Sequence, residues 1–398
     1  MTQALQARGR LDALDSARGF AIALMVMSHT VKGLLPFNAL PDWGLVPVHL
    51  FTKFSSTLFI LVFGVSVAVA YVPKVWTSQW PKARRALWTR ALIVLASYKV
   101  LTVVQMFERY DRQYMIDALM FLRFTDFAEI LQFYGWLLLL LPLFLPAWRW
   151  LSLWGQLGVA WSLGFIGFLL RQHFDFFGIW QLQAIWVEHD DAFCFGLLTR
   201  GPMVLVAMAF GGMLTNDPVH QRERLKTLSS AAIVLGLMGL TFFLGSYWEN
   251  LGNVARALAK NYGKHPPRVI FMSFSAGGAF LLFGLLAKAK GFVHTLLWPF
   301  RVVGEQSLFC FNAHLIIVFV VFRWGMGLRH EVSYSQALVL TGANLVLCGT
   351  GAAAWGWLKR RLSPKPRLRA VTRVREDAFD AEKTDVVGQE LFARVRRR

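Results

Sequence analysis

The chain has 398 residues, of which 56% are hydrophobic and only 16% charged, whereas a soluble domain of this size needs a larger share of polar surface. Apolar runs long enough to cross about 30 Å of hydrocarbon recur along the chain, which predicts an all-α, polytopic integral membrane helix bundle in a lipid bilayer. The net charge of +19 does not indicate nucleic-acid binding, because the basic residues lie in short segments between the apolar runs. The three cysteines are too few and too scattered for a disulfide framework, and no metal site is expected.

Ten transmembrane helices are predicted. In chain order they cover residues 16–35, 51–72, 91–107, 130–147, 151–170, 201–214, 229–248, 269–287, 296–322 and 335–358. An even number of spans places both termini on one side, and the tail after Trp357 holds 13 Lys and Arg against 6 Asp and Glu. The positive-inside rule then predicts that both termini are cytoplasmic. We expect a ten-helix transmembrane domain, residues 1–358, and a basic cytoplasmic tail, residues 359–398.

The first span carries two groups that membrane helices rarely contain without using them, Arg18 and His29. At 1.5 Å per residue the two side chains lie about 16 Å apart along the helix, so an Arg18 at one interface places His29 near the bilayer centre. Asp15 precedes Arg18 by three residues and can pair with it on one helix face. Arg18 can therefore hold a phosphate, and His29 can take part in proton chemistry. The alternative is that each only makes a structural hydrogen bond inside the bundle.

Later segments add further polar candidates. His314 lies about 20 Å beyond Arg301 along the ninth span, which predicts a depth similar to that of His29. Glu129 stands where the fourth span begins, and Trp186 could stack on a sugar or belong to the interfacial aromatic belt. The acidic run 188–191 could bind a metal or act as a base, but we expect it to be solvated.

One loop, residues 249–268, disobeys the charge rule. It is expected outside the cell but contains four cations, Arg256, Lys260, Lys264 and Arg268. Either a span is miscounted, or these cations bind an anionic group, such as the carboxylate of a succinyl group or an anionic glycan.

At this point the residues resemble a known family. The segment Arg-Leu-Asp-Ala-Leu-Asp-Ser-Ala-Arg-Gly-Phe-Ala at 10–21, followed by Met-Ser-His at 27–29, resembles the opening of the membrane acyltransferase-3 superfamily, whose hallmark is an Arg, ten residues and a His. Residues 58–66 and 129–134 are similar to later helices of that family, and Gly-Glu-Gln-Ser-Leu at 304–308 is similar to its Gly-Arg-x-Ser motif.

Two branches resemble the chain most, the OpgC-type glucan succinyltransferases and the heparan-α-glucosaminide acetyltransferase branch. The Tyr-Pro-Pro element of the latter is similar to residues 262–267. The chain departs from the superfamily at Glu305, where many relatives have Arg. The nearest match to its Arg-x-x-Arg pair is Lys-Ala-Arg-Arg at 82–85 with Arg90.

The resemblance implies a membrane acyltransferase, and we expect a bacterial cytoplasmic (inner) membrane because no eukaryotic targeting signal is evident. The enzyme would move an acetyl or succinyl group from cytoplasmic acyl-CoA, a co-substrate rather than a bound cofactor, to a hydroxyl of an extracytoplasmic carbohydrate. His29 would be the general base or carry the acyl group, and His314 would orient the site or bind the thioester carbonyl. The expected donor-binding residues are Arg18, Asp15, Arg84, Arg85 and Arg90, and the expected acceptor-binding residues are Glu129, Lys264, Arg268 and Trp186. The alternative function is a secondary transporter or flippase for a lipid-linked or small carbohydrate, since buried His, Arg and Glu also serve proton coupling.

Overall fold

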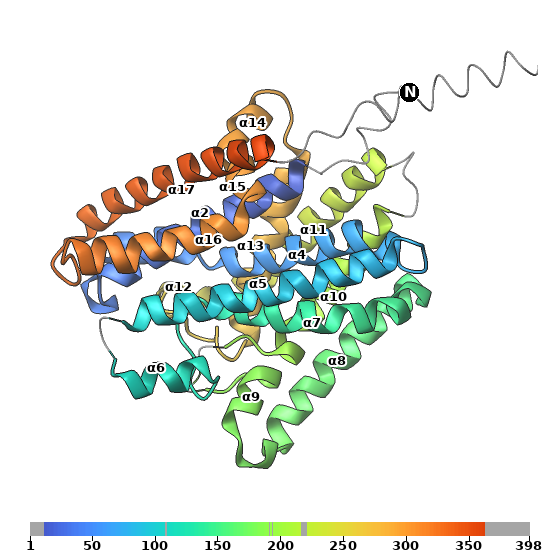
Figure 1. The fold of residues 1–398 in the computed structure, drawn as a ribbon, viewed down its shortest axis with the longest axis horizontal. Coiled ribbons are helices and arrows are strands. Elements are labelled where there is room, and N and C mark those ends of the chain that lie inside the picture. Colours follow the sequence, from blue (N-terminus) through green and yellow to red (C-terminus); the bar gives the residue numbers. More distant parts are fainter. Residues whose placement is uncertain (1–11, 108–109, 191, 193, 216–220, 363–398) are drawn as a thin grey trace, which may run out of the picture. The chain divides into compact units, whose positions relative to one another are not determined.

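The computed structural model describes residues 12–107, 110–190, 192, 194–215 and 221–362, and within these ranges every regular element is a helix (Figure 1). The prediction of an all-α helix bundle is confirmed. The chain divides into two compact units, Met1–Ala353 and Ala354–Arg398. The predicted domain limit at residue 358 stays a prediction, and residues 363–398 of the expected tail lie outside the described residues.

Each of the ten predicted spans overlaps one of the helices given next, and the ninth overlaps a second, shorter helix as well. These helices are α2 (Asp12–Leu34), α4 (Phe54–Tyr71), α5 (Trp80–Met106), α7 (Glu129–Trp150), α8 (Leu153–His173), α10 (Leu197–Met213), α11 (Gln221–Tyr247), α13 (Val269–Lys288), α16 (Ser307–Ile316) with its π-helical continuation Ile317–Gly325, and α17 (Tyr334–Leu362). Eight helical stretches in the described part of the chain are long and apolar enough to cross a membrane. The two spans outside that set are α2, which carries several charged side chains, and α10, which has only 17 residues.

Short helices join the long ones. They are α3 (Asp42–Gly44), α6 (Arg112–Leu119), α9 (Trp180–Val187), α12 (Leu251–Ala259), α14 (Gly291–Leu296) and α15 (Trp298–Glu305). The predicted ninth span, 296–322, is therefore not one continuous helix. It consists of α15 and α16, and the helical ladder is interrupted at Gln306, whose φ and ψ are −114° and 38°.

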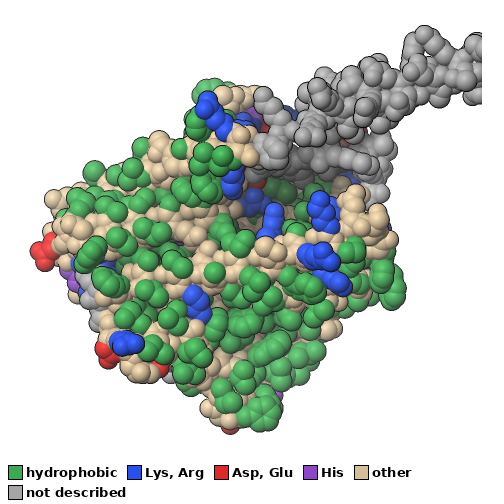
Figure 2. All heavy atoms as spheres, in the orientation of Figure 1, with side chains coloured by type: hydrophobic (Ala, Val, Ile, Leu, Met, Phe, Trp, Pro, Cys, Tyr) green, Lys and Arg blue, Asp and Glu red, His purple; other side chains and the backbone are tan. Residues whose placement is uncertain are grey.

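The burial of the spans separates central helices from lipid-facing ones. In the most apolar window of the stretch that contains α4, 67% of the residues are buried, against 11% in α8. Since hydrophobic side chains cover α8 on the face shown in Figure 2, this helix is suited to contact lipid. The large core cluster includes many residues of α2, α4, α7 and α10 and one buried residue of α8, Ala160.

The central helix α2 lies in very close contact with α15. A Cβ atom on Gly19 would stand 1.7 Å from the carbonyl oxygen of Phe300, and one on Gly304 would stand 1.8 Å from that of Asp15. Only glycine fits at both positions, because any side chain would overlap the backbone of the other helix. This contact brings the backbone of α15 within reach of Arg18.

Successive long helices run in opposite directions, so their ends gather at two ends of the bundle. We call one of them the basic end, defined by the exposed cations at the start of α5: Lys82, Arg84, Arg85 and Arg90. Figure 2 shows Lys and Arg side chains gathered there. Helices α4 and α7 end at the basic end, and Arg149 near the end of α7 donates hydrogen bonds to the carbonyl oxygens of Pro73 and Val75. The first turns of α4 and α7 therefore lie in the opposite half.

Candidate active site

A hydrogen-bonded pair of histidines joins α2 to α16. Nδ1 of His29 lies 3.0 Å from Nε2 of His314, and Nδ1 of His314 lies 3.0 Å from the carbonyl oxygen of Cys310. A carbonyl oxygen only accepts, so Nδ1 of His314 carries a hydrogen and Nε2 of the neutral ring accepts one from Nδ1 of His29. This tautomer leaves the lone pair of His29 on Nε2, which is the atom that a general base or a nucleophile needs.

Neighbouring side chains hold both rings in place. Asn344 of α17 donates to the carbonyl oxygen of His314 at 3.3 Å and to Oγ1 of Thr30 at 3.0 Å, which ties three helices together. The ring of Phe127 stands edge-on to His29 with their centroids 5.2 Å apart. His314 has no exposed surface, whereas His29 is partly exposed. The pair thus has a buried orienting member and an accessible reactive member.

His29 lines a small cavity of about 50 Å³ in the half of the bundle away from the basic end. Most of its wall comes from the second half of α2, the first turns of α4 and α7, and the loop between α12 and α13. Three ammonium groups belong to this lining, those of Lys32, Lys53 and Lys264. Among the described residues, Glu129 supplies the single carboxylate of the lining.

The loop that follows α12 closes one side of this cavity. Oδ1 of Asn261 accepts from Nζ of Lys53 at 2.6 Å and from Nζ of Lys32 at 3.3 Å. Nζ of Lys264 lies 2.9 Å from Oε1 of Glu129, so the predicted acceptor-site residues Lys264 and Glu129 form an ion pair. The basic loop is therefore part of the site.

The other cations of that loop lie outside the cavity. Arg256 forms an exposed ion pair with Asp42 at 3.1 Å, and Arg268 donates to the hydroxyl of Tyr262 at 2.8 Å. Arg268 does not line the cavity, and its acceptor-binding role stays a prediction. Of the four cations in residues 249–268, Lys264 is the one that lines the cavity.

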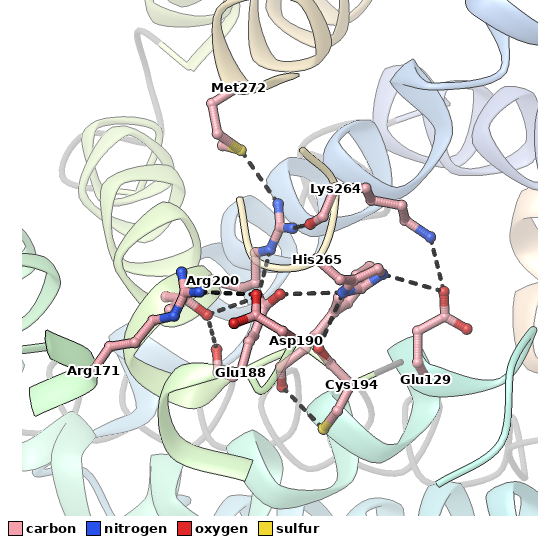
Figure 3. Close-up of polar contacts among 12 residues, drawn as sticks. Glu129, Arg171, Glu188, Asp190, Cys194, Arg200, Lys264, His265 and Met272 are labelled. Atoms are coloured by element: carbon pink, nitrogen blue, oxygen red, sulfur yellow. Dashed lines mark hydrogen bonds and ion pairs between the residues drawn. The ribbon is translucent and has the colours of Figure 1, made fainter. Parts of the chain in front are cut away.

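A buried ionic network anchors the loop that follows α12 (Figure 3). Oε1 of Glu188 accepts from Nε of Arg200 at 3.0 Å and from Oγ1 of Thr199 at 2.8 Å, and Oε2 lies 3.1 Å from Nδ1 of His265. Arg200 also donates to the carbonyl oxygen of Lys264. The network thus connects the segment before α10 and the first turn of α10 to Lys264, the residue that pairs with Glu129.

The environment of this network sets the charges of its members. Burial favours the neutral form of Glu188, but the charge of Arg200 and the hydrogen bond from His265 outweigh it, so the pKa of Glu188 lies below its usual value. Burial, with the neighbouring Lys264, lowers the pKa of His265, although Glu188 acts in the opposite direction. Near neutral pH, Glu188 is ionised and His265 is neutral.

The expectation that the acidic run 188–191 is solvated is wrong for Glu188. Glu188 has no exposed surface, whereas Asp190 forms an exposed pair with Arg171 at 3.1 Å. Glu188 is buried because Arg200, which is 12 positions away in the sequence, and His265, which is 77 positions away, supply partners for both of its oxygens.

At the other end of α2, Arg18 is held by protein partners. Nη1 donates to Oδ1 of Asp15 at 2.7 Å and to the carbonyl oxygen of Gly304 at 3.3 Å, and Nη2 donates to Oγ of Ser66 at 2.7 Å. The Asp15–Arg18 pair has the predicted i, i+3 spacing. These contacts join α2, α4 and α15, and donor binding by Arg18 stays a prediction.

The remaining predicted donor residues do not meet His29. Arg84, Arg85 and Arg90 are exposed on the first turns of α5 at the basic end, where Arg84 packs on Trp88 and Arg90 faces the ring of Tyr71. Trp186, also predicted to bind the acceptor, is 39% exposed on α9 and does not line the cavity.

Several residues of the site escaped the sequence analysis, chiefly Lys32, Lys53, Asn261 and Asn344. Lys32 has a usable signal, because it follows His29 by one helical turn and shares its face. Lys53 also has a usable signal, because it falls inside the predicted span 51–72, where a cation is rarely found without a use. Asn261 and Asn344 give no such signal, since isolated amides occur throughout loops and helices.

The fold and the site define a polytopic membrane protein with a histidine pair at a cationic cavity. The chain belongs to the family of the heparan-alpha-glucosaminide N-acetyltransferase catalytic domain, whose family model matches residues 10–243. That stretch contains His29, Lys53 and Glu129, while His314 and the loop after α12 lie beyond it. No curated protein and no solved structure matches the chain. The membership supports a membrane acetyltransferase-type function and not the transporter alternative, and it does not extend to the OpgC-type branch.

Proposed function

We propose that the protein transfers an acyl group, acetyl or succinyl, from acyl-CoA to a hydroxyl of an extracytoplasmic carbohydrate. The observation that carries this proposal is the chain of hydrogen bonds from the Cys310 carbonyl through His314 to His29, which leaves a basic nitrogen at a cavity wall. A bacterial cytoplasmic membrane is the proposed location. The positive-inside rule would put the basic end in the cytoplasm, and the cavity then lies in the half nearer the acceptor.

In the proposed reaction, Nε2 of His29 accepts the proton of the acceptor hydroxyl as its oxygen attacks the thioester carbon. The resulting tetrahedral intermediate collapses by breaking the carbon–sulfur bond, and the imidazolium returns the proton to the departing thiolate of CoA. His314 holds the ring of His29 in the required tautomer, which makes it a positioning residue. A covalent acyl group on His29 is the competing route, in which the same nitrogen attacks the thioester first.

The donor is proposed to bind through cations at the basic end. Exposed guanidinium groups of Arg84, Arg85 and Arg90 can form forked hydrogen bonds with the phosphates of acyl-CoA. Since His29 lies more than half of α2 away from that end, only the extended pantetheine arm would have to approach it.

The test is transfer of radiolabel from acetyl-CoA and from succinyl-CoA to cell-envelope glycans, in membranes that contain equal amounts of each variant. A general base contributes roughly 10² to 10⁴ in rate, so His29→Ala should lower transfer by that factor. His173→Ala is the control, because His173 is exposed at the end of α8 and away from the cavity. Equal labelling by the wild type and His29→Ala would remove His29 from the mechanism, and no transfer by the wild type from either donor would overturn the proposal.

Quenching the reaction with labelled donor and no acceptor separates the two routes. Acid-labile label on the wild-type protein that is missing from His29→Ala would show the covalent route. Its absence in a preparation that transfers label to glycan would support direct base catalysis.

A further inference from the structure

The lining of the cavity carries more positive than negative side chains. Lys32, Lys53 and Lys264 face a single lining carboxylate, Glu129, among the residues that the structure describes. Oε1 of Glu129 is already bound by Lys264 at 2.9 Å. The nearby Asp126 is exposed and does not line the cavity.

Lys53 is the most unusual of these cations. It is only 4% exposed, and the side-chain partner of its ammonium is the neutral amide oxygen of Asn261 at 2.6 Å. In the described part of the chain, no carboxylate lies within ion-pair distance of Lys53. In proteins a buried cation is normally paired with an anion.

The geometry around Asn261 brings a second cation to the same point. Lys32 donates to the same oxygen at 3.3 Å, so two ammonium groups converge on one neutral acceptor and repel each other. An oxyanion between them would relieve this repulsion and accept a hydrogen bond from the ammonium of Lys53.

The helix α7, which starts at the cavity, favours the same charge. Ile130 in its first turn belongs to the lining. The free N–H groups at the beginning of a helix carry partial positive charge and stabilise anions.

We infer that this cavity binds an anionic oxygen group of one of the two substrates, at Lys53 and Lys32 and beside His29. The inference rests on the proposed acyl transfer and adds the charge of the substrate to it. The group is a carboxylate or a similar oxyanion, carried either on the far end of a dicarboxylic acyl group or on the acceptor sugar.

The first experiment measures anion binding without catalysis. Succinate, and the neutral isostere succinamide as control, are added to purified full-length protein, and the thermal unfolding midpoint is recorded. Succinate should raise the midpoint of the wild type and not that of Lys53→Gln, while succinamide should raise neither. Lys288→Gln is the matched control, because it removes one exposed charge at the far end of α13 and should respond to succinate as the wild type does.

Two further variants distinguish a loss of anion binding from a folding defect. Lys53→Arg keeps the charge and should keep at least part of the succinate response. Asn261→Asp places a carboxylate of the same shape between the two lysines, so it should raise the midpoint in the absence of succinate and abolish the response. Equal responses of Lys53→Gln and the wild type, or no response of the wild type, would overturn the inference.

The second experiment finds which substrate carries the anion. If it is the acyl group, Lys53→Gln should lower kcat/KM at least about tenfold more for succinyl-CoA than for acetyl-CoA. If the acceptor carries the anion, Lys53→Gln should lower kcat/KM by the same factor with both donors when the acceptor is a glucuronoside. With methyl glucoside as the acceptor, kcat/KM should stay unchanged for both donors. Equal activity of Lys53→Gln and the wild type in all four combinations would overturn the inference. No transfer by the wild type, with succinate binding intact, would instead contradict the proposed function and leave the anion site standing.

Discussion

Arg18 and His29 lie on the same helix, eleven residues apart, yet their surroundings differ. The guanidinium of Arg18 is held by Asp15, Ser66 and the backbone of Gly304, which come from α2, α4 and α15. His29 donates to His314 on one side, and on the other side it faces a small cavity of about 50 Å³. Both nitrogens Nη1 and Nη2 of Arg18 are bonded by protein groups, although its side chain is 20% exposed, whereas the ring of His29 lines the cavity.

This contrast separates two uses of a buried polar residue. When the protein supplies all the partners, as it also does around Glu188, removal of one partner should lower the free energy of unfolding. When one side faces a cavity, removal should mainly change what the cavity binds or catalyses. Variants at both kinds of residue test this distinction, and they are given from the largest expected change in free energy to the smallest.

The largest expected effect is the loss of stability in Glu188→Gln. Glu188 and Arg200 are 0% and 2% exposed in their side chains, so the change leaves a buried guanidinium without its counter-charge. Breaking such a pair costs about 3–5 kcal/mol. Thermal unfolding of the purified protein should show a large fall in the midpoint. Asp190→Asn, which breaks the exposed pair with Arg171, should cost less than about 1 kcal/mol, and equal losses in the two variants would contradict the prediction.

Next in size is the loss of rate in His314→Ala. Without an acceptor for its Nδ1 hydrogen, His29 is no longer held with the lone pair on Nε2, and we expect kcat to fall about 100-fold, or about 2.7 kcal/mol, with KM for the donor unchanged. Gln at this position offers an amide oxygen in place of Nε2 and should restore part of kcat. A rise in KM with kcat unchanged, or equal defects in the Ala and Gln variants, would show that His314 does not position His29.

A smaller effect is expected for Arg18→Lys. The ammonium keeps the charge but cannot reach Asp15, Ser66 and Gly304 together, since the forked geometry is lost. We expect a loss of about 1–3 kcal/mol in stability and a change of less than about threefold in KM for acyl-CoA. Ser66→Ala, which removes one of these bonds, should cost about 1 kcal/mol. A KM raised tenfold at an unchanged unfolding midpoint would instead establish Arg18 as a donor-binding residue.

The same contrast explains how far the sequence could predict this protein. The long apolar runs predict the helices, because hydrophobic length is a property of each segment alone. The pair Asp15–Arg18 follows from helical spacing, and His29 and His314 could be placed at similar depths from the rise per residue.

Contacts made through loops could not be predicted in this way. Lys53 and Asn261 are 208 positions apart, and their contact depends on how the chain after α12 turns back into the bundle. Glu188 was expected to be solvated because its sequence neighbours are polar, but its burial is decided by Arg200 and His265. Sequence patterns thus identified groups that could be functional, and tertiary contacts decide which of them are closed in and which face the cavity.

The smallest expected effect is a dependence of stability on pH that comes from the network behind the cavity. His265 has its pKa lowered from 6.5, chiefly by burial, so below about pH 6.5 the unfolded chain binds a proton there that the folded protein does not. Glu188, whose pKa is lowered from 4.5 as the charge of Arg200 overcomes burial, acts in the same direction at lower pH. The contribution of these two groups to the free energy of unfolding is therefore fully present above pH 6.5. It falls as the pH decreases, by at most about 1.4 kcal/mol per pH unit for each group. Unfolding midpoints measured from pH 8 to pH 5 should fall less steeply for His265→Asn than for the wild type. The exposed control His173→Asn should follow the wild type, and an unchanged slope in His265→Asn would show that this network does not set the acid sensitivity.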